Sequence, residues 1–170
     1  FEFVQFHPSY DYTDFVEGLR PINNENGQVG FELKNGIFKD FCERAADAWI
    51  KATNNSKDPK ELQRCREENA PKYVFVIDEI NRGEISKIFG ELFFSIDPGY
   101  RGTEGMVSTQ YANMVQGENQ FDKELGNKKT GQFFVPKNVY IIGTMNDIDR
   151  SVESMDFAMR RRFTFKEITA

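Results

Sequence analysis

Two continuous apolar segments, residues 73–77 and 139–143, constrain the fold more than any other feature of this sequence. Both are rich in β-branched and aromatic residues, and neither alternates with polar residues. Such a run is typical of a strand that is buried on both faces of a parallel sheet. Segments with helical spacing of apolar residues lie between and beside the two runs. This order predicts an α/β fold with a mainly parallel sheet and flanking helices.

The other elements follow from hydrophobic periodicity and from residues that start or stop helices. Asp58 followed by Pro59 is a favourable helix start, because Asp caps helices and Pro suits the first helical position. We expect strands at 2–6, 133–135 and 163–165, helices at 12–19, 38–53, 59–69, 85–93 and after Ser151, a hairpin over 31–38 around Asn35-Gly36, and irregular polar structure over 101–129.

Composition and charge exclude several classes of protein. Lys and Arg total 22 and Asp and Glu total 27, so the net charge of −5 argues against nucleic-acid binding over the whole surface. No apolar stretch is long enough to span a membrane, and the first residues do not resemble a signal peptide. The two cysteines, Cys42 and Cys65, have no metal-binding spacing and are expected to be free thiols. These features indicate a cytoplasmic protein without membrane association.

The first apolar segment ends in two acidic residues, Asp78 and Glu79. Ionised groups at the end of a buried strand are costly unless they have a partner, and Mg²⁺ is a suitable one. Asp78 would hold the metal directly or through water, and Glu79 would orient or deprotonate an attacking water. The alternative is a strand end exposed to solvent, or an N-cap for the following helix.

The second apolar segment leads to Asn146, with Asp149 and Ser151 shortly after it. If the two strands are neighbours, Asn146 lies beside the acidic pair, because the carboxyl ends of parallel strands share one edge of the sheet. An amide there can position a water or a γ-phosphate oxygen. The alternative is an Asx turn or a helix cap, in which Asp149 or Ser151 would serve.

Three consecutive arginines, residues 160–162, follow the last predicted helix. Cations at this position complement the negative end of the helix dipole. The functional alternative is an arginine finger, which would reach the nucleotide of a neighbouring subunit. Arg161 and Arg162 are the candidates for that role.

Together these motifs resemble the AAA+ motor of McrB-type proteins, the nucleotide-hydrolysing subunit of modification-dependent restriction systems. Residues 76–83 (Val-Ile-Asp-Glu-Ile-Asn-Arg-Gly) resemble its Walker B segment. Residues 141–151 resemble its Met-Asn-Thr-Ala-Asp-Arg-Ser signature, and residues 157–163 resemble its arginine-rich helix end. Residues 6–10 and 14–21 resemble the segment after its second strand. The resemblance covers nearly the whole chain.

The resemblance implies an AAA+ P-loop NTPase core that hydrolyses GTP or ATP with Mg²⁺ in a homo-oligomeric ring. It also implies a 5-methylcytosine-specific restriction endonuclease, in which the motor drives DNA translocation for a separate McrC-like nuclease subunit. Other regions of the parent protein would bind the DNA. The implied roles are metal binding by Asp78, activation of water by Glu79, sensing and positioning by Asn146 and Asp149, and a trans-acting finger from Arg161 or Arg162.

No phosphate-binding loop of the form Gly, four residues, Gly-Lys-Ser/Thr occurs in the sequence. The resemblance therefore implies that residues 1–170 are an internal fragment, from the second to the last strand of the core. The first strand, the phosphate loop and the helical lid would lie outside it, and the isolated fragment would be inactive. The absent strand belongs between 139–143 and 163–165, so we expect a gap or irregular pairing of the sheet there.

The sequence leaves open which nucleotide is used and which of several functions the motor serves. Asp147-Ile148 replaces the Thr-Ala of the signature, which leaves the choice between GTP, used by the best-known members, and ATP undecided. The other possible functions are a MoxR-like remodelling ATPase that does not act on DNA and a catalytically inactive module that only holds a ring together. The segments 15–21 and 145–151 argue against the first, and the intact acidic pair argues against the second.

Overall fold

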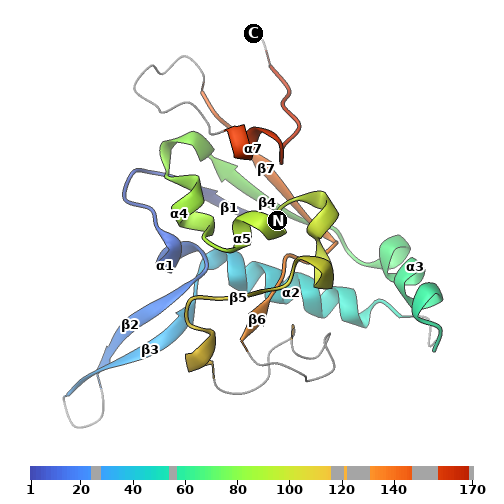
Figure 1. Ribbon diagram of the computed structural model, residues 1–170, viewed down its shortest axis with the longest axis horizontal. Coiled ribbons are helices and arrows are strands. Elements are labelled where there is room, and N and C mark those ends of the chain that lie inside the picture. Colours follow the sequence, from blue (N-terminus) through green and yellow to red (C-terminus); the bar gives the residue numbers. More distant parts are fainter. Residues whose placement is uncertain (24–27, 54–56, 116–120, 122–130, 147–156, 169–170) are drawn as a thin grey trace.

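The computed structural model describes residues 1–23, 28–53, 57–115, 121, 131–146 and 157–168. Its centre is a three-stranded parallel sheet with the strand order β1-β4-β7 (Figure 1). Gln5 lies opposite Asp78, and Ile77 lies opposite Gly143. This arrangement confirms the predicted α/β fold with a mainly parallel sheet. The three strands are β1 (Glu2–Gln5), β4 (Tyr73–Asp78) and β7 (Val139–Gly143).

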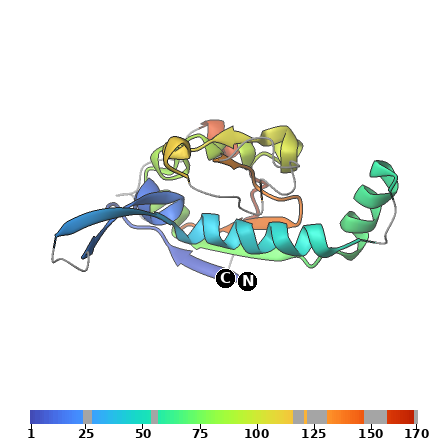
Figure 2. The ribbon, with the colours of Figure 1, turned by 90° about the horizontal axis from the view of Figure 1, so that it is seen from below.

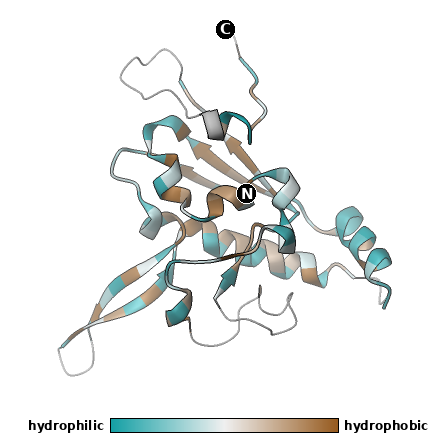
Figure 3. Ribbon diagram, in the orientation of Figure 1, coloured by the Kyte–Doolittle hydropathy of each residue, from teal (hydrophilic) through white to brown (hydrophobic). Residues whose placement is uncertain are grey.

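Four helices lie over one face of this sheet (Figure 2): α1 (Tyr12–Phe15), α2 (Ile37–Lys51), α4 (Ile85–Phe89) and α5 (Leu92–Ser95). On the covered face, Phe75 and Ile77 are fully buried. On the other face, the side chains of Tyr140 and Ile142 are 48% and 51% exposed. The prediction that residues 139–143 are buried on both faces is therefore wrong for the part of the chain described here. Figure 3 shows that the strands of the sheet are nonetheless largely hydrophobic.

Within the described residues, the parallel sheet ends at β7. Residues 161–168 contain no strand, so the predicted final strand at 163–165 is wrong. An extended segment forms a strand only where a neighbouring strand satisfies its backbone groups, and none of the described strands lies beside these residues. The described part of the sheet therefore ends at β7, and the expected gap between β7 and a final strand stays a prediction.

Helices α2 (Ile37–Lys51) and α3 (Pro59–Asn69) agree with the prediction. Asp58 caps α3 by accepting a hydrogen bond from the Lys60 N–H at 2.9 Å. The helix predicted over 85–93 is instead two helices, α4 (Ile85–Phe89) and α5 (Leu92–Ser95). Gly90 separates them with a φ of 52°, and a Cβ at this position would lie 2.9 Å from the Tyr12 ring.

An antiparallel hairpin of β2 (Glu17–Asn23) and β3 (Val29–Asn35) projects from the body of the molecule (Figure 1). The predicted helix over 12–19 is therefore only α1 (Tyr12–Phe15), and the predicted hairpin around Asn35-Gly36 is wrong. Gly36 instead starts α2, because its backbone packs closely on α1. A Cβ on Gly36 would lie 2.4 Å from the carbonyl carbon of Phe15.

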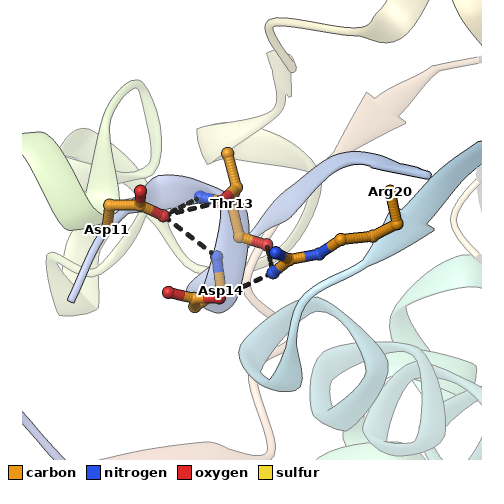
Figure 4. A network of polar contacts seen from close by, with 4 residues as sticks. All are labelled: Asp11, Thr13, Asp14 and Arg20. Atoms are coloured by element: carbon orange, nitrogen blue, oxygen red, sulfur yellow. Dashed lines mark hydrogen bonds and ion pairs between the residues drawn. The ribbon is translucent and has the colours of Figure 1, made fainter. Parts of the chain in front are cut away.

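Polar contacts fix the base of the hairpin to α1 (Figure 4). Asp11 caps α1 by accepting hydrogen bonds from the Thr13 N–H at 2.8 Å and the Thr13 hydroxyl at 2.7 Å. The hydroxyl bond is the main reason that the pKa of Asp11 is lowered. Arg20 on β2 donates to the Thr13 carbonyl and to Asp14. The hairpin therefore leaves the body in a defined direction at its base.

The segment after α5 is largely irregular, in agreement with the prediction for residues 101–129. Residues 116–120 and 122–130 of that segment lie outside the described residues. The predicted strand at 133–135 overlaps β6 only at Phe133, because β6 covers residues 132–133 and residues 134–135 are not in a strand. None of the described helices has the length and hydrophobicity to cross a membrane. The elements of this part are η2 (Pro98–Tyr100), η3 (Gly102–Gly105), β5 (Val107–Ser108), η4 (Ala112–Met114), β6 (Gln132–Phe133) and, later, α7 (Phe157–Arg160).

The core between the sheet and the helices is built from aromatic rings. Phe15 stacks on Phe38 with 4.7 Å between ring centroids, and Phe38 meets Phe75 edge to face at 5.0 Å. Cys42 is a buried free thiol in the same core, and burial raises its pKa. The two cysteines are free, as predicted. The rings join α1, α2 and β4 into one packed unit, so the strand ends are held on a rigid support.

A buried ion pair lies beneath the hairpin. Glu17 at the start of β2 is paired with Lys39 on α2, and the two side chains are 0% and 4% exposed. The second carboxylate oxygen of Glu17 accepts a hydrogen bond from the Tyr111 N–H at 3.3 Å. Because the pair joins three segments, it holds the hairpin base, α2 and the irregular region together.

Removal of one charge from this pair is expected to destabilise the domain strongly. Lys39→Met leaves the Glu17 carboxylate buried without its counter-charge, which costs about 3–5 kcal/mol. Urea unfolding of wild type and variant measures the difference. The double variant Glu17→Gln with Lys39→Met removes both charges and keeps an acceptor for Tyr111, so most of the stability should return. A loss below about 1 kcal/mol in the single variant would contradict this account.

Candidate functional site

The carboxylate of Asp78 is held from both sides at the carboxyl edge of the sheet. Asp78 ends the middle strand, β4. The Thr144 hydroxyl, just past β7, donates to Asp78 Oδ1 at 2.5 Å. The Gln5 amide, at the end of β1, donates to Asp78 Oδ2 at 3.0 Å. The neighbouring strands therefore fix the plane of this carboxylate.

Glu79 has an unusual backbone conformation, with φ at 53° and ψ at 45°. It is the only non-glycine residue with a positive φ in the described part of the chain. Its N–H donates to Thr144 Oγ1 at 3.3 Å, and the next N–H, of Ile80, donates to the Thr144 carbonyl at 2.9 Å. The left-handed turn redirects the chain from β4 into η1 (Ile80–Arg82). Such strained conformations are concentrated at functional sites.

The side chain of Glu79 is 21% exposed and has a cation nearby. Its Oε2 lies 3.3 Å from Nε of Arg82. The charge of this oxygen is therefore balanced by Arg82, while the Glu79 side chain as a whole stays partly exposed at the end of β4.

The acidic pair fits a magnesium ion that is bound together with phosphate. Among the residues placed by the structure, no group of three or more His, Cys, Asp or Glu is arranged to hold a metal. Mg²⁺ commonly takes one or two carboxylates from the protein and fills its remaining positions with water and substrate phosphates. Asp78 and Glu79 supply that number of carboxylates. The hydrogen bonds to Asp78 leave further lone pairs on its oxygens.

The prediction that Asn146 lies near the acidic pair depends on the two apolar strands being neighbours. This condition is confirmed, because β4 and β7 pair in parallel. Asn146 lies two residues beyond Thr144, which contacts Asp78, and its side chain is exposed. Asp149 lies outside the described residues, as do Asp147 and Ile148. The functions of Asn146 and Asp149 therefore stay predictions.

The two candidate finger arginines differ in their surroundings. Arg161 is exposed just after α7. The guanidinium of Arg162 lies 4.1 Å from the ring centroid of Phe93, on α5. Met159, buried at 1% exposure, anchors α7 in the core. Arg161 is thus the more exposed of the two, whereas Arg162 packs on Phe93.

Sequence reasoning identified the acidic pair but missed three residues that contact it: Gln5, Thr144 and Arg82. For Gln5 and Thr144 a signal was present, because both are polar residues at the carboxyl ends of predicted strands. Their relevance depends on strand order, which places β1 and β7 on either side of β4. Arg82 is three residues beyond Glu79, a spacing that brings side chains together in a helical turn.

Comparison with known proteins gives a family match over residues 1–163, to the family described as AAA domain (dynein-related subfamily). The chain is 42% identical over 165 residues to the Type IV methyl-directed restriction enzyme EcoKMcrB subunit of Escherichia coli (strain K12). This alignment covers 97% of the chain and 28% of that protein. It is 25% identical over 179 residues to the Type II restriction enzyme BsuMI component YdiS of Bacillus subtilis (strain 168), with 96% of the chain and 46% of that protein covered. The chain thus spans less than half of either relative, and the resemblance to McrB-type motors is confirmed.

Proposed function

The chain belongs to the AAA domain family, dynein-related subfamily, and we propose that it is part of the nucleoside-triphosphatase motor of a restriction system. The observation that carries the proposal is the acidic pair Asp78 and Glu79 at the carboxyl edge of the parallel sheet. Ligands of open α/β sheets bind beyond this edge. The restraint of Asp78 from both sides supports a role that needs a fixed carboxylate.

In the proposed reaction, each residue has a separate task. Asp78 would hold Mg²⁺, and Glu79 would accept the proton of the attacking water through its carboxylate. Bound Mg²⁺ would neutralise the charge that develops on the phosphates. Asn146 and Asp149 orient the water and the γ-phosphate. Arg161 reaches the nucleotide of the neighbouring subunit, in agreement with its exposure.

The wider assembly is proposed from the relatives. Their names describe a subunit and a component of restriction enzymes, one of them methyl-directed. We infer a cytoplasmic homo-oligomeric ring that uses GTP or ATP to translocate DNA for a separate McrC-like endonuclease subunit. DNA would be bound by other regions of the parent protein, which agrees with the net charge of −5 of this chain. Without a phosphate-binding loop, the isolated chain is expected to be inactive.

The full-length protein is expected to release phosphate from GTP or ATP only when Mg²⁺ is present. Removal of Mg²⁺ with a chelator should lower turnover by a factor of about 10² or more, because the phosphate charge is then not neutralised. Steady-state phosphate release with each nucleotide measures this and identifies the preferred base. Absence of Mg²⁺-dependent release from both nucleotides would contradict the proposal.

A further inference from the structure

Thr144 contacts both acidic residues through a single hydroxyl group. The hydroxyl donates to Asp78 Oδ1 at 2.5 Å, and its oxygen accepts the Glu79 N–H at 3.3 Å. The first bond restrains a side chain, whereas the second supports the left-handed backbone turn of Glu79. One hydroxyl thus fixes two groups that must act on the same nucleotide.

We propose that Thr144 is a positioning residue, which fixes the Asp78 carboxylate relative to the backbone turn at Glu79. The inference rests on the proposed function, because it gives Thr144 a purpose in nucleotide hydrolysis. Gln5 holds the opposite carboxylate oxygen of Asp78, whereas Thr144 contacts both Asp78 and the backbone of Glu79. Thr144 therefore couples metal binding to the placement of the base.

The backbone of Thr144 makes separate hydrogen bonds that do not depend on its side chain. Its N–H donates to the Ile77 carbonyl at 2.9 Å, and its carbonyl accepts the Ile80 N–H at 2.9 Å. These bonds continue the pairing between β4 and the segment after β7. A substitution that removes only the hydroxyl is therefore expected to leave this strand pairing intact.

Loss of the hydroxyl has a definite consequence for the site. Asp78 Oδ1 loses its donor, and the Glu79 N–H loses its acceptor. Among the described residues, the Asp78 carboxylate is then held by Gln5 alone, and the strained turn at Glu79 loses one of its hydrogen bonds. A displacement of about 1 Å in a reacting group can lower a rate on the order of 10²-fold. Nucleotide binding, which depends mainly on the phosphate cradle, should change little.

The test compares Thr144→Val with Thr144→Ser in the full-length protein. Valine keeps the β-branched shape without the hydroxyl, whereas serine keeps the hydroxyl without the methyl group. Thr144→Val should lower kcat about 10- to 100-fold with KM within about twofold, and Thr144→Ser should stay within about threefold of wild type. Wild-type kcat in Thr144→Val, or equal losses in both variants, would overturn the inference.

A second readout does not depend on turnover. Amide hydrogen exchange of a peptide that spans residues 78–81, in the nucleotide-free protein, should be faster in Thr144→Val and unchanged in Thr144→Ser. Equal exchange in all three proteins would also overturn the inference.

Glu79→Gln in the same series separates the two levels of the proposal. If Glu79→Gln is inactive but Thr144→Val turns over as wild type does, the inference fails and the proposed function stands. If wild type and Glu79→Gln have equal turnover, the proposed function fails, and the role of Thr144 fails with it.

Discussion

Glu79→Gln is expected to lower nucleoside-triphosphate turnover of the full-length protein by a factor of about 10² or more, the size typical for removal of a general base. Glutamine has nearly the same shape as glutamate but cannot take a proton from the attacking water. The loss should therefore be in kcat, while nucleotide binding is retained. Phosphate release at saturating Mg²⁺ and nucleotide measures kcat, and equilibrium titration with the nucleotide measures binding.

Glu84→Gln is the matched control for this variant. Glu84 lies close to Glu79 in sequence, but its side chain is 60% exposed and pairs with Lys87. An exposed pair of this kind contributes little, so turnover should stay within about twofold of wild type. A Glu79→Gln protein that retains more than about a tenth of the wild-type rate would contradict the role of Glu79 as the base.

Arg161→Ala is expected to lower turnover of the assembled protein on the order of 10³-fold, the lower end of the range for loss of an arginine finger. The physical reason is the loss of a cation from the charge that develops on the transferred phosphate. Arg161 is exposed and follows an anchored helix, which agrees with the proposed role. Steady-state phosphate release by the full-length protein measures the effect.

Arg162→Met provides the comparison for Arg161→Ala. The Arg162 guanidinium packs on the Phe93 ring, so its loss should lower the free energy of unfolding by about 0.5–2 kcal/mol. Turnover should be reduced far less than in Arg161→Ala. A reversed order of the two effects on turnover would assign the finger to Arg162.

The central part of the fold could be predicted because its signals are local. The continuous apolar runs at 73–77 and 139–143 identified β4 and β7, and Asp58-Pro59 gave the start of α3 correctly. The acidic pair was found for a similar reason, since the cost of placing two carboxylates at the end of an apolar strand can be read from the sequence.

The remaining features depend on contacts between distant residues. The hairpin of β2 and β3 was missed because residues 12–19 have helical spacing, while Gly36 is required by its packing on Phe15. The break at Gly90 depends on the Tyr12 ring. The contacts of Thr144 and Gln5 with Asp78 follow from strand order, and the packing of Arg162 on Phe93 joins the segment after α7 to α5. Such pairings cannot be obtained from local propensity.

The most direct test of a shared site at the interface between subunits is to mix the two inactive variants. In a ring of Glu79→Gln and Arg161→Ala subunits, some interfaces combine an intact Glu79 with an intact Arg161 from the neighbour. Random assembly makes about one interface in four intact, so the mixture should recover a clear fraction of wild-type phosphate release. Turnover that stays as low as in each variant alone would contradict hydrolysis by Glu79 of one subunit and Arg161 of the next.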